Sequence, residues 1–482
     1  MLTYNLDDRG GIPLYEYLYN CIKKDILQGK IKADEKLPSK RELAKNLSIS
    51  IITVQNAYEQ LVAEGYIYAV EKRGYFASGI NLLKPFEEDR VENSKDDSDE
   101  IYGKNLSDSS DEAAGSNNYF IDFRTSSINY EKFPFSIWSK IMRQVLTEQE
   151  EAFTRNLPSM GLDDLRKAIE DYLYQFRGMN VSYRQIIIGA GTEYLYSLII
   201  QLLGLKNVIA IEDPGHRKVS QIYTVQGAVC KHIPLDNYGM DIEKLKSSGA
   251  NIAHISPSHH FPTGIVMPVK RRHQLLKWAD EDDDRYIIED DYDSEFRFTG
   301  RPIPTMQSTD YNEKVIYVNT FSKTLMPSIR IAYMVLPPHL VKKYNEKMGF
   351  YSCTVSGFEQ MALAKFISEG YYERHINRMR NYYRTHRNNV IQAIKESELG
   401  KCSQIKEENS GLHFILKIKT EMEDDLLVKK AGEKGVNISC VSEYCTDTAE
   451  QFKHMFLINY SNADEERVKD AMKIIYDIAK KD

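Results

Sequence analysis

Two polar motifs follow two apolar, β-branched runs that lie about thirty residues apart in the chain. YIIEDDYDSEF carries Asp290 and Tyr292, and VIYVNTFSKTLMPSIR carries Lys323. Such runs are typical of buried parallel strands, and open α/β sheets bind ligands at the carboxyl ends of their strands. A lysine placed there suits a Schiff base with an aldehyde cofactor, and Asp290 suits the pyridinium nitrogen of such a cofactor. The two motifs therefore predict a cofactor site on a parallel sheet.

Length and composition indicate a globular protein with more than one domain. The chain has 482 residues, of which 42% are hydrophobic and 28% are charged. It has no run of roughly 18 apolar residues, so no membrane span is expected, and its first residues lack the pattern of a signal peptide. Its six cysteines form no CxxC pair. Such scattered cysteines are typical of reduced thiols, which favours a cytoplasmic protein.

Charge and composition divide the chain into three parts. Residues 81–118 are rich in Asp, Glu, Ser and Asn and too poor in apolar residues to form a core, so we expect a flexible acidic linker. Residues 1–80 precede this linker as one domain. In residues 119–482 apolar runs alternate with helical patterns, which predicts a mostly parallel α/β sheet. From about residue 345 to 482 the pattern indicates a smaller α+β domain.

Two helix signals follow each other in LPSKRELAKNLSISIITVQNAYEQLVAEGY. Ser39 and Glu42 form a capping box that opens a helix through about Leu47. Ser50 caps a second helix, and Val54, Ala57, Tyr58 and Leu61 fall on one face of it. EKRGYFAS then predicts a β-wing. The pattern is that of a winged helix-turn-helix, although a small helical protein-interaction domain remains an alternative.

A winged helix would place several polar residues against DNA. The start of the second helix enters the major groove in a helix-turn-helix, where Gln and Asn pair with base edges. Residues at the start of the first helix and at the wing tip would contact phosphates. The candidate DNA contacts are Ser39, Lys40, Arg41, Thr53, Gln55, Asn56, Lys72, Arg73 and Gly74.

The same stretch resembles the GntR-type winged helix over nearly the whole segment. The resemblance is carried by LPSKRELAKNL, TVQNAYEQLVAEGY and RGYF. One position departs from the pattern. The family usually has arginine after the serine that precedes the recognition helix, and this chain has Ile51 there. We expect that change to weaken or redirect one phosphate or guanine contact.

An anion site is predicted where IIIGAGTEYLYSLIIQLL passes from a strand through a glycine turn into a helix. The turn spans Gly189 to Gly191, and the helix begins near Thr192, with Glu193 in its first turn. Amides at a helix N-terminus favour a phosphate dianion. Ser322 and Arg330, which flank Lys323, can complete the cradle. Taken singly, a lysine after a strand is usually a solvated surface residue, so the prediction depends on the whole ordered set.

The region from about Asp122 onward resembles fold-type I aminotransferases, and the whole chain resembles the MocR/GabR family of transcriptional regulators. The matching motifs are DFR…FPFSIW, GAGTEYL, EDPGHRK, SPSHHFPTG, IIEDDYDSEF and TFSKTLMPSIR. The resemblance implies pyridoxal 5'-phosphate as the cofactor, with Lys323 as its Schiff-base lysine and Asp290 on its ring nitrogen. It also implies Tyr292 on the phenolate oxygen, and Ser322 and Arg330 on the phosphate. A head-to-tail homodimer is implied as well.

Three positions depart from the family member that senses γ-aminobutyrate. His216 stands where that member stacks a tyrosine on the ring, and Lys218 and Asn462 stand at the positions of its two carboxylate-binding arginines. Independently of this resemblance, the chain has no arginine between Arg387 and Arg467. A lysine is a point charge and not a bidentate fork. A pocket for an ordinary α-amino acid or for γ-aminobutyrate is therefore not expected.

The sequence thus predicts a cytoplasmic regulator that binds operator DNA and a small-molecule effector, either the cofactor itself or a small amine or amino acid. A working aminotransferase with an accessory DNA-binding domain is the alternative, and we expect any transaminase activity to be weak. No metal site is predicted. The adjacent His259 and His260 would face opposite ways on a strand and have no carboxylate beside them in sequence, so a role in the ring pocket is favoured.

Overall fold

The computed structural model describes residue 4 and residues 12–47, 49–64, 66–70, 73–78, 119–124, 132–148, 153–298 and 304–480. The chain divides into two compact units, Met1–Ala113 and Ala114–Asp482, which are described separately below. The predicted linker at 81–118 lies outside the described residues.

The N-terminal unit is a winged helix-turn-helix. Its elements are α1 (Leu14–Leu27), α2 (Lys40–Leu47), α3 (Ile51–Ala63) and the antiparallel pair β1 (Ile67–Val70) and β2 (Gly74–Ala77). The predicted capping box is present, because Ser39 Oγ accepts from the Glu42 amide at 3.2 Å and Glu42 Oε2 accepts from the Ser39 amide at 3.4 Å. Ser50 Oγ caps α3 by accepting from the Thr53 amide at 3.1 Å.

The apolar face of α3 forms the core of this unit. Val54, Ala57, Tyr58 and Leu61 are fully buried, as the helical spacing predicts. They pack on residues of α1, including Leu18 and Ile22. The chain before α2 adds a short edge to the wing, since Leu37 donates its amide to the Tyr75 carbonyl and Lys36 pairs with Phe76.

The larger unit is built on a sheet of eight strands in the order β4-β11-β10-β9-β8-β5-β6-β7. β11 is antiparallel to β4 and β10, and β7 is antiparallel to β6. The remaining strands run parallel, as the apolar runs predict. The bounds are β4 Ile186–Gly189, β5 Val208–Asp213, β6 Val229–Asp236, β7 Gly239–Met240, β8 Ile252–Ile255, β9 Tyr286–Asp290, β10 Val315–Thr320 and β11 Ala332–Val335.

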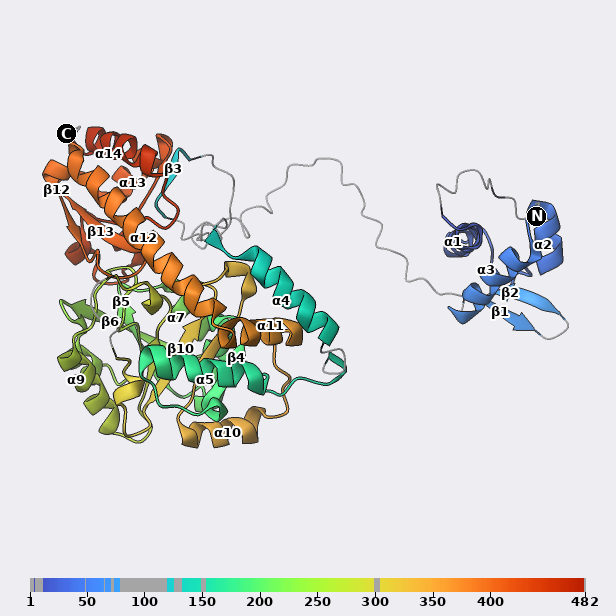
Figure 1. Ribbon diagram of the computed structural model, residues 1–482, viewed down its shortest axis with the longest axis horizontal. Helices are drawn as coiled ribbons and strands as arrows, with labels where there is room; N and C mark the ends of the chain where they lie inside the picture. Colours follow the sequence, from blue (N-terminus) through green and yellow to red (C-terminus); the bar gives the residue numbers. More distant parts are fainter. Residues whose placement is uncertain are drawn as a thin grey trace, which may run out of the picture. The chain divides into compact units, whose positions relative to one another are not determined.

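Helices cover both faces of this sheet (Figure 1). Successive residues of β4 enter different cores: Ile186 and Ile188 pack toward α4, α5 and α11, and Ile187 packs toward α6, α7 and α10. A sheet buried on both faces explains why its strands are continuous apolar runs. The helices are α4 Phe135–Glu148, α5 Asp163–Arg177, α6 Thr192–Leu203, α7 Arg217–Val225, α8 Ile242–Ser247, α9 Val269–Asp280, α10 Pro338–Met348 and α11 Gly357–Ser368.

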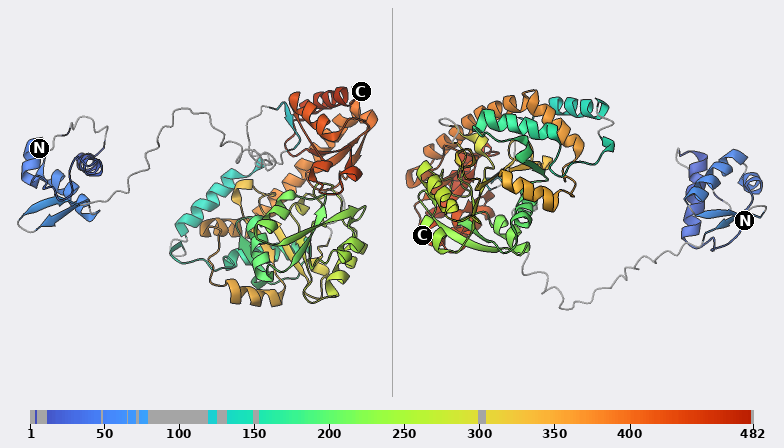
Figure 2. Two further views of the ribbon diagram at one scale, coloured as in Figure 1. Left: turned by 180° about the vertical axis from the view of Figure 1, so that it is seen from behind. Right: turned by 90° about the horizontal axis from the view of Figure 1, so that it is seen from below.

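A smaller α+β part follows, joined to the large sheet by the long helix α12 (Tyr371–Glu396) (Figures 1 and 2). Its four-stranded sheet has the order β12-β13-β16-β15. The short β3 pairs in parallel with β14, so residues 119–124 belong to this part. The bounds are β3 Ile121–Asp122, β12 Ser403–Lys406, β13 His413–Ile418, α13 Asp424–Glu433, β14 Val436–Asn437, β15 Ser439–Cys440, β16 Met455–Asn459 and α14 Glu465–Ala479.

The boundary of the smaller part differs from the one expected from sequence. Val355, Ala362 and Leu363 pack in the core with α5 and β4 of the large sheet. The smaller part therefore begins within α12 rather than near residue 345. Among the described residues no helix is long and apolar enough to cross a membrane.

Candidate functional site

One edge of the large sheet collects the predicted cofactor residues. Five strands run parallel there, namely β4, β5, β8, β9 and β10, so their carboxyl ends meet at that edge. Gly191, His216, His259, Asp290 and Lys323 lie at or just beyond those ends. The sequence motifs, which are spread over more than 130 residues from Gly191 to Lys323, are thus brought to a single edge.

Asp290 ends β9 as a buried carboxylate with one unpaired oxygen. Its Oδ2 accepts from the Tyr196 hydroxyl at 2.7 Å and lies 3.6 Å from His254 Nε2. Its Oδ1 is buried and has no hydrogen-bond partner in the described structure. Burial, and then Asp290, hold the pKa of Tyr196 well above its ordinary value, so Tyr196 remains a donor. A buried oxygen without a partner is costly, and the N–H of a pyridinium ring would satisfy it.

Tyr292 and His259 form a second group on this edge. His259 Nδ1 lies 2.9 Å from Asp293 Oδ2 and 3.3 Å from the Tyr292 hydroxyl. Burial raises the pKa of Tyr292 well above its ordinary value, followed in effect by Asp293 and other carboxylates. Tyr292 is therefore a neutral donor, which suits a phenolate oxygen.

The expectation for the adjacent histidines needs one correction. His259 and His260 lie in the loop after β8 and are both buried. Carboxylates do approach them in space, because His259 meets Asp293 and His260 Nε2 lies 3.5 Å from Glu212 Oε2. Sequence neighbours could not show this, since Glu212 comes from β5 and Asp293 from the loop after β9. No group of metal-binding side chains of the required size is found among the described residues.

The predicted phosphate cradle places a glycine against a guanidinium. Gly191 precedes α6 with φ of 90°, and a Cβ built on it would lie 2.5 Å from Arg330 Nη2. Only glycine allows that close approach at this backbone angle. Ser322 Oγ is buried and has no hydrogen-bond partner in the described part of the chain. The amides that open α6, the Ser322 hydroxyl and Arg330 together form an anion-binding set.

Glu193 connects this cradle to the expected effector position. Its Oε2 accepts from Arg330 Nη2 at 2.6 Å, and Lys218 forms a close ion pair with its Oε1. Burial alone would raise the pKa of Glu193, but Lys218 and Arg330 bring it below its ordinary value. Asn462 lies on an exposed turn after β16 and makes no side-chain hydrogen bond within the described residues. Lys218 is thus engaged by Glu193, and Asn462 is a neutral amide.

A row of aromatic rings lies beside these residues, and sequence reasoning did not predict it. The Phe261 ring centroid is 5.4 Å from His216, 5.0 Å from Tyr444 and 5.6 Å from His413. The His413 ring in turn lies 4.6 Å from His259. Burial lowers the pKa of His413 well below its ordinary value, and Lys323 contributes to this, so the two side chains are within electrostatic range. The rings come from four separate segments. His216 and His259 were expected near the cofactor ring, whereas Phe261, His413 and Tyr444 were not.

The second candidate site is the outward face of the winged helix. The first turn of α3 is capped by Ser50, and Asn56 is exposed on the following turn. Gln55 is half-buried and donates through Nε2 to Glu59 Oε1 at 2.8 Å, so it is held by its own helix. Ile52 was not among the predicted contacts, yet its side chain is 69% exposed.

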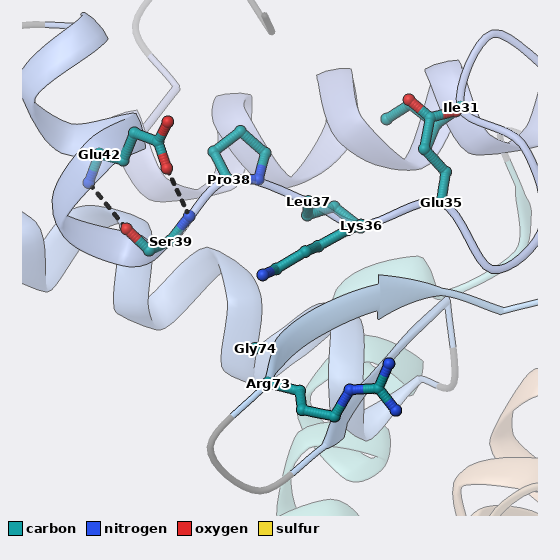
Figure 3. Close-up of a pocket in the computed structure, with 9 residues that line it drawn as sticks. All are labelled: Ile31, Glu35, Lys36, Leu37, Pro38, Ser39, Glu42, Arg73 and Gly74. Carbon is teal, nitrogen blue, oxygen red and sulfur yellow. Dashed lines mark hydrogen bonds between the residues drawn. The ribbon is translucent and has the colours of Figure 1, made fainter.

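A groove of about 430 Å³ separates the start of α2 from the wing. Ser39, Arg73 and Gly74 line it, as does Lys36, whose side chain extends between Ser39 and Arg73 (Figure 3). Lys36 was missed by the sequence prediction because it lies before the capping box. The other predicted contacts are Lys40 and Arg41 on α2, Arg41 being exposed, and Thr53 on α3. Lys72 lies outside the described residues.

Both halves of the chain match known families. Residues 14–76 match the model described as bacterial regulatory proteins of the gntR family, and residues 122–475 match aminotransferase class I and II. The chain is 41% identical over 432 residues to the uncharacterized HTH-type transcriptional regulator YdeL of Bacillus subtilis, covering 89% of each chain. It is 31% identical to the probable rhizopine catabolism regulatory protein MocR of Rhizobium meliloti, covering 91% of this chain and 88% of that one. The chain belongs to the MocR-type transcriptional regulators.

Two further similarities are informative about this MocR-type regulator. It is 29% identical to the pyridoxine biosynthesis transcriptional regulator PdxR of Corynebacterium glutamicum, covering 88% of this chain and 87% of that one. It is also similar to the crystal structure of the multiple substrate aminotransferase from Thermococcus profundus, with a TM-score of 0.67 and 25% identity. That similarity covers 76% of this chain and 92% of the aminotransferase chain. The larger unit therefore has the aminotransferase fold throughout.

The MocR-type regulator binds pyridoxal phosphate and operator DNA. The buried atoms of the sheet edge fit the cofactor, because Asp290 Oδ1 and Ser322 Oγ have no hydrogen-bond partner among the described residues and would suit a ring nitrogen and a phosphate. Bound there, the cofactor supplies an electrophilic aldehyde and an electron-withdrawing ring. Residue by residue, the roles of Lys323, Tyr292 and Arg330 remain predictions.

Proposed function

We propose that this regulator senses pyridoxal phosphate, or an amine without a tightly held carboxylate, at the Lys323 edge of its large sheet. The observation that carries the proposal is the composition of that edge. A row of rings runs from His216 to His259, and one of its members, His413, lies within electrostatic range of Lys323. The two positions expected to hold a carboxylate are a lysine that is paired with Glu193 and the neutral Asn462.

The protonation of the buried imidazoles supports this ligand class. Burial lowers the pKa of His260 to about 3, and it lowers the pKa of His413 well below its ordinary value. Both rings are therefore neutral at pH 7 and give a carboxylate no ionic partner. Burying an unpaired carboxylate costs several kcal/mol. A ligand that depends on its amine and on ring contacts avoids this cost.

The cofactor itself is the favoured effector among the two. The residues predicted to contact the cofactor lie at or near this sheet edge, whereas the two predicted effector positions are a paired lysine and a neutral amide. The similarity to PdxR, whose name assigns it to pyridoxine biosynthesis, is consistent with this choice. A regulator of cofactor supply would use the same lysine, cradle and ring contacts as an aminotransferase without needing to orient a substrate.

A working aminotransferase is the alternative that this edge disfavours. Transamination needs a substrate held in one orientation over the cofactor, and a misplacement of about 1 Å can cost a factor of about 100 in rate. A bidentate arginine usually provides that orientation. Without one, we expect a bound amine to react slowly, which leaves a ligand-bound regulator.

We also propose the head-to-tail homodimer and the cytoplasmic location expected from sequence. Phe350, Tyr351 and Phe358 expose their rings between α10 and the start of α11, which suits a subunit interface. All six cysteines are free thiols, as is usual in a reducing compartment. Ligand binding would then shift the dimer between two conformations that differ in their affinity for the operator. The size of the shift is set by how much more tightly the ligand binds one conformation than the other.

The test is a titration of the full-length protein with amino acids, γ-aminobutyrate and free pyridoxal phosphate. Visible absorption reports the cofactor, and the affinity for a selected DNA duplex reports regulation. We expect pyridoxal phosphate to change duplex affinity and common amino acids to be converted slowly or not at all. Conversion of an amino acid at about 1–1000 per second, the ordinary range for enzymes, would overturn the proposal in favour of the aminotransferase. Lys323→Ala is the control, because a change in its absorption or duplex affinity on adding a ligand would not depend on Lys323.

A further inference from the structure

An exposed isoleucine lies on the outward face of α3. Ile52 is 69% exposed, whereas most isoleucines of the described chain are buried. It precedes Gln55, Asn56 and Glu59 by three, four and seven residues, so these four share one helical stripe. That stripe lies opposite the face that carries Val54, Ala57, Tyr58 and Leu61, which are all fully buried.

The place of Ile52 on the helix determines what it can meet. It occupies the second position after the Ser50 cap, in the first turn of the second helix of the helix-turn-helix. The N-terminal residues of that helix contact base edges in the major groove. Ile52 therefore stands one turn ahead of Asn56 on the surface that faces the bases.

The chemistry of the major groove then identifies the contact. An isoleucine side chain has no donor or acceptor, so it cannot pair with the polar atoms of a base edge. The C5-methyl group of thymine is the one apolar group that the four bases present in this groove. Among the base edges, a branched side chain with an exposed end buries the most apolar surface against that methyl group.

We propose that Ile52 is a specificity-determining residue of this regulator and contacts a thymine methyl group in each half-site of its operator. Each half-site then contains a position confined to thymine, next to the position read by Asn56. The inference concerns DNA alone and is independent of the identity of the effector; the division into half-sites rests on the proposed homodimer.

Uracil substitution tests this contact, since deoxyuridine differs from thymidine only by that methyl group. Duplexes are selected from a random library with the full-length protein, and each thymine of the recovered half-site is replaced in turn by uracil. We expect one position at which the replacement weakens binding about fourfold per half-site, which corresponds to about 0.8 kcal/mol for one buried apolar carbon. At that position Ile52→Ala should bind thymine and uracil equally.

Val62→Ala is the matched control. Val62 is a β-branched residue near the other end of α3 and is 38% exposed, so its replacement should leave the uracil effect unchanged. Both substituted side chains are outside the buried core, so both variants should fold like the wild type, as circular dichroism can verify. The proposal is overturned if no duplex is selected, if no thymine position is sensitive to uracil, or if Ile52→Ala keeps the wild-type sensitivity. A loss of gene control by Ile52→Ala with unchanged duplex affinity and unchanged sensitivity would assign Ile52 to a protein partner instead.

Discussion

Replacing Asp290 by asparagine should separate cofactor binding from the stability of the protein. Asp290 is 8% exposed, and its Oδ2 accepts from Tyr196 at 2.7 Å while its Oδ1 has no partner in the described structure. Asparagine has nearly the same shape but no charge. It keeps an acceptor for the Tyr196 hydroxyl and removes the negative partner of a pyridinium nitrogen.

The size of the effect follows from that lost charge. A hydrogen bond to a charged group contributes about 1.5–3 kcal/mol, so the Asp290→Asn variant should bind pyridoxal phosphate roughly 10–150-fold more weakly. The cofactor-free protein should keep its stability or gain slightly, because a buried charge with one unpaired oxygen is removed. The two expectations have opposite directions, which distinguishes a site residue from a purely structural one.

Unfolding with and without cofactor measures both quantities. At a cofactor concentration 100 times its Kd the wild type gains about 2.7 kcal/mol of stability, and a variant that binds 100-fold more weakly gains only about 0.4 kcal/mol. Asp241→Asn is the matched control, because Asp241 caps α8 through its side chain and follows β7 at one end of the sheet order, whereas Lys323 follows β10. Equal stabilisation of the wild type and Asp290→Asn by the cofactor would refute the assignment of Asp290. A loss of cofactor stabilisation in Asp241→Asn would show that the assay is not specific.

Three further predictions concern DNA binding and pH. Arg41→Ala should weaken binding to all duplexes. It should also lower, by about one, the steepness with which the logarithm of the binding constant falls with the logarithm of the salt concentration, measured by titration at several ionic strengths. An unchanged slope would show that Arg41 does not contact a phosphate. Asn56→Ala should relax base preference at one position of the selected duplex, by about 1–3 kcal/mol, and a uniform loss at all positions would contradict base reading. Burial, as the main cause, lowers the pKa of His375 to about 4, and its Nε2 lies 2.9 Å from the Thr324 carbonyl. The neutral His375 ring therefore contributes to stability above the unfolded-state pKa of about 6.5, and this contribution, at most about 3 kcal/mol, is lost as the pH falls toward 4. The free energy of unfolding of His375→Gln, measured with denaturant, should fall less than that of the wild type over this pH range. The same pH dependence in both proteins would refute the prediction.

The large sheet and the winged helix were largely predictable because their signals are local. Continuous apolar runs mark strands that are buried on both faces, and the Ser39 capping box is complete within four residues. The order of the sheet also explains why Asp290 and Lys323 could be placed together. β9 and β10 are parallel neighbours, so residues at their carboxyl ends share an edge.

Contacts between distant segments were not predictable in the same way. The ring row joins Phe261 and His413, which are about 150 residues apart, and no local pattern links them. The ion pair between Lys218 and Glu193 of another helix was likewise not visible in the sequence. The start of the smaller part was misplaced because α11 has an ordinary helical pattern, and only its packing on α4 and α5 assigns it to the large sheet.

The most direct test compares the wild type with Lys323→Ala. Two properties are measured in one preparation of each protein: the visible absorption of bound cofactor, and the affinity for the selected duplex with and without pyridoxal phosphate. We predict that the wild type shows the absorption band, that both proteins bind the duplex, and that the cofactor changes the duplex affinity of the wild type only. Two results would contradict the claim that Lys323 links the cofactor to DNA binding. In one, Lys323→Ala keeps the absorption band without a new covalent site. In the other, its duplex affinity responds to the cofactor as that of the wild type does.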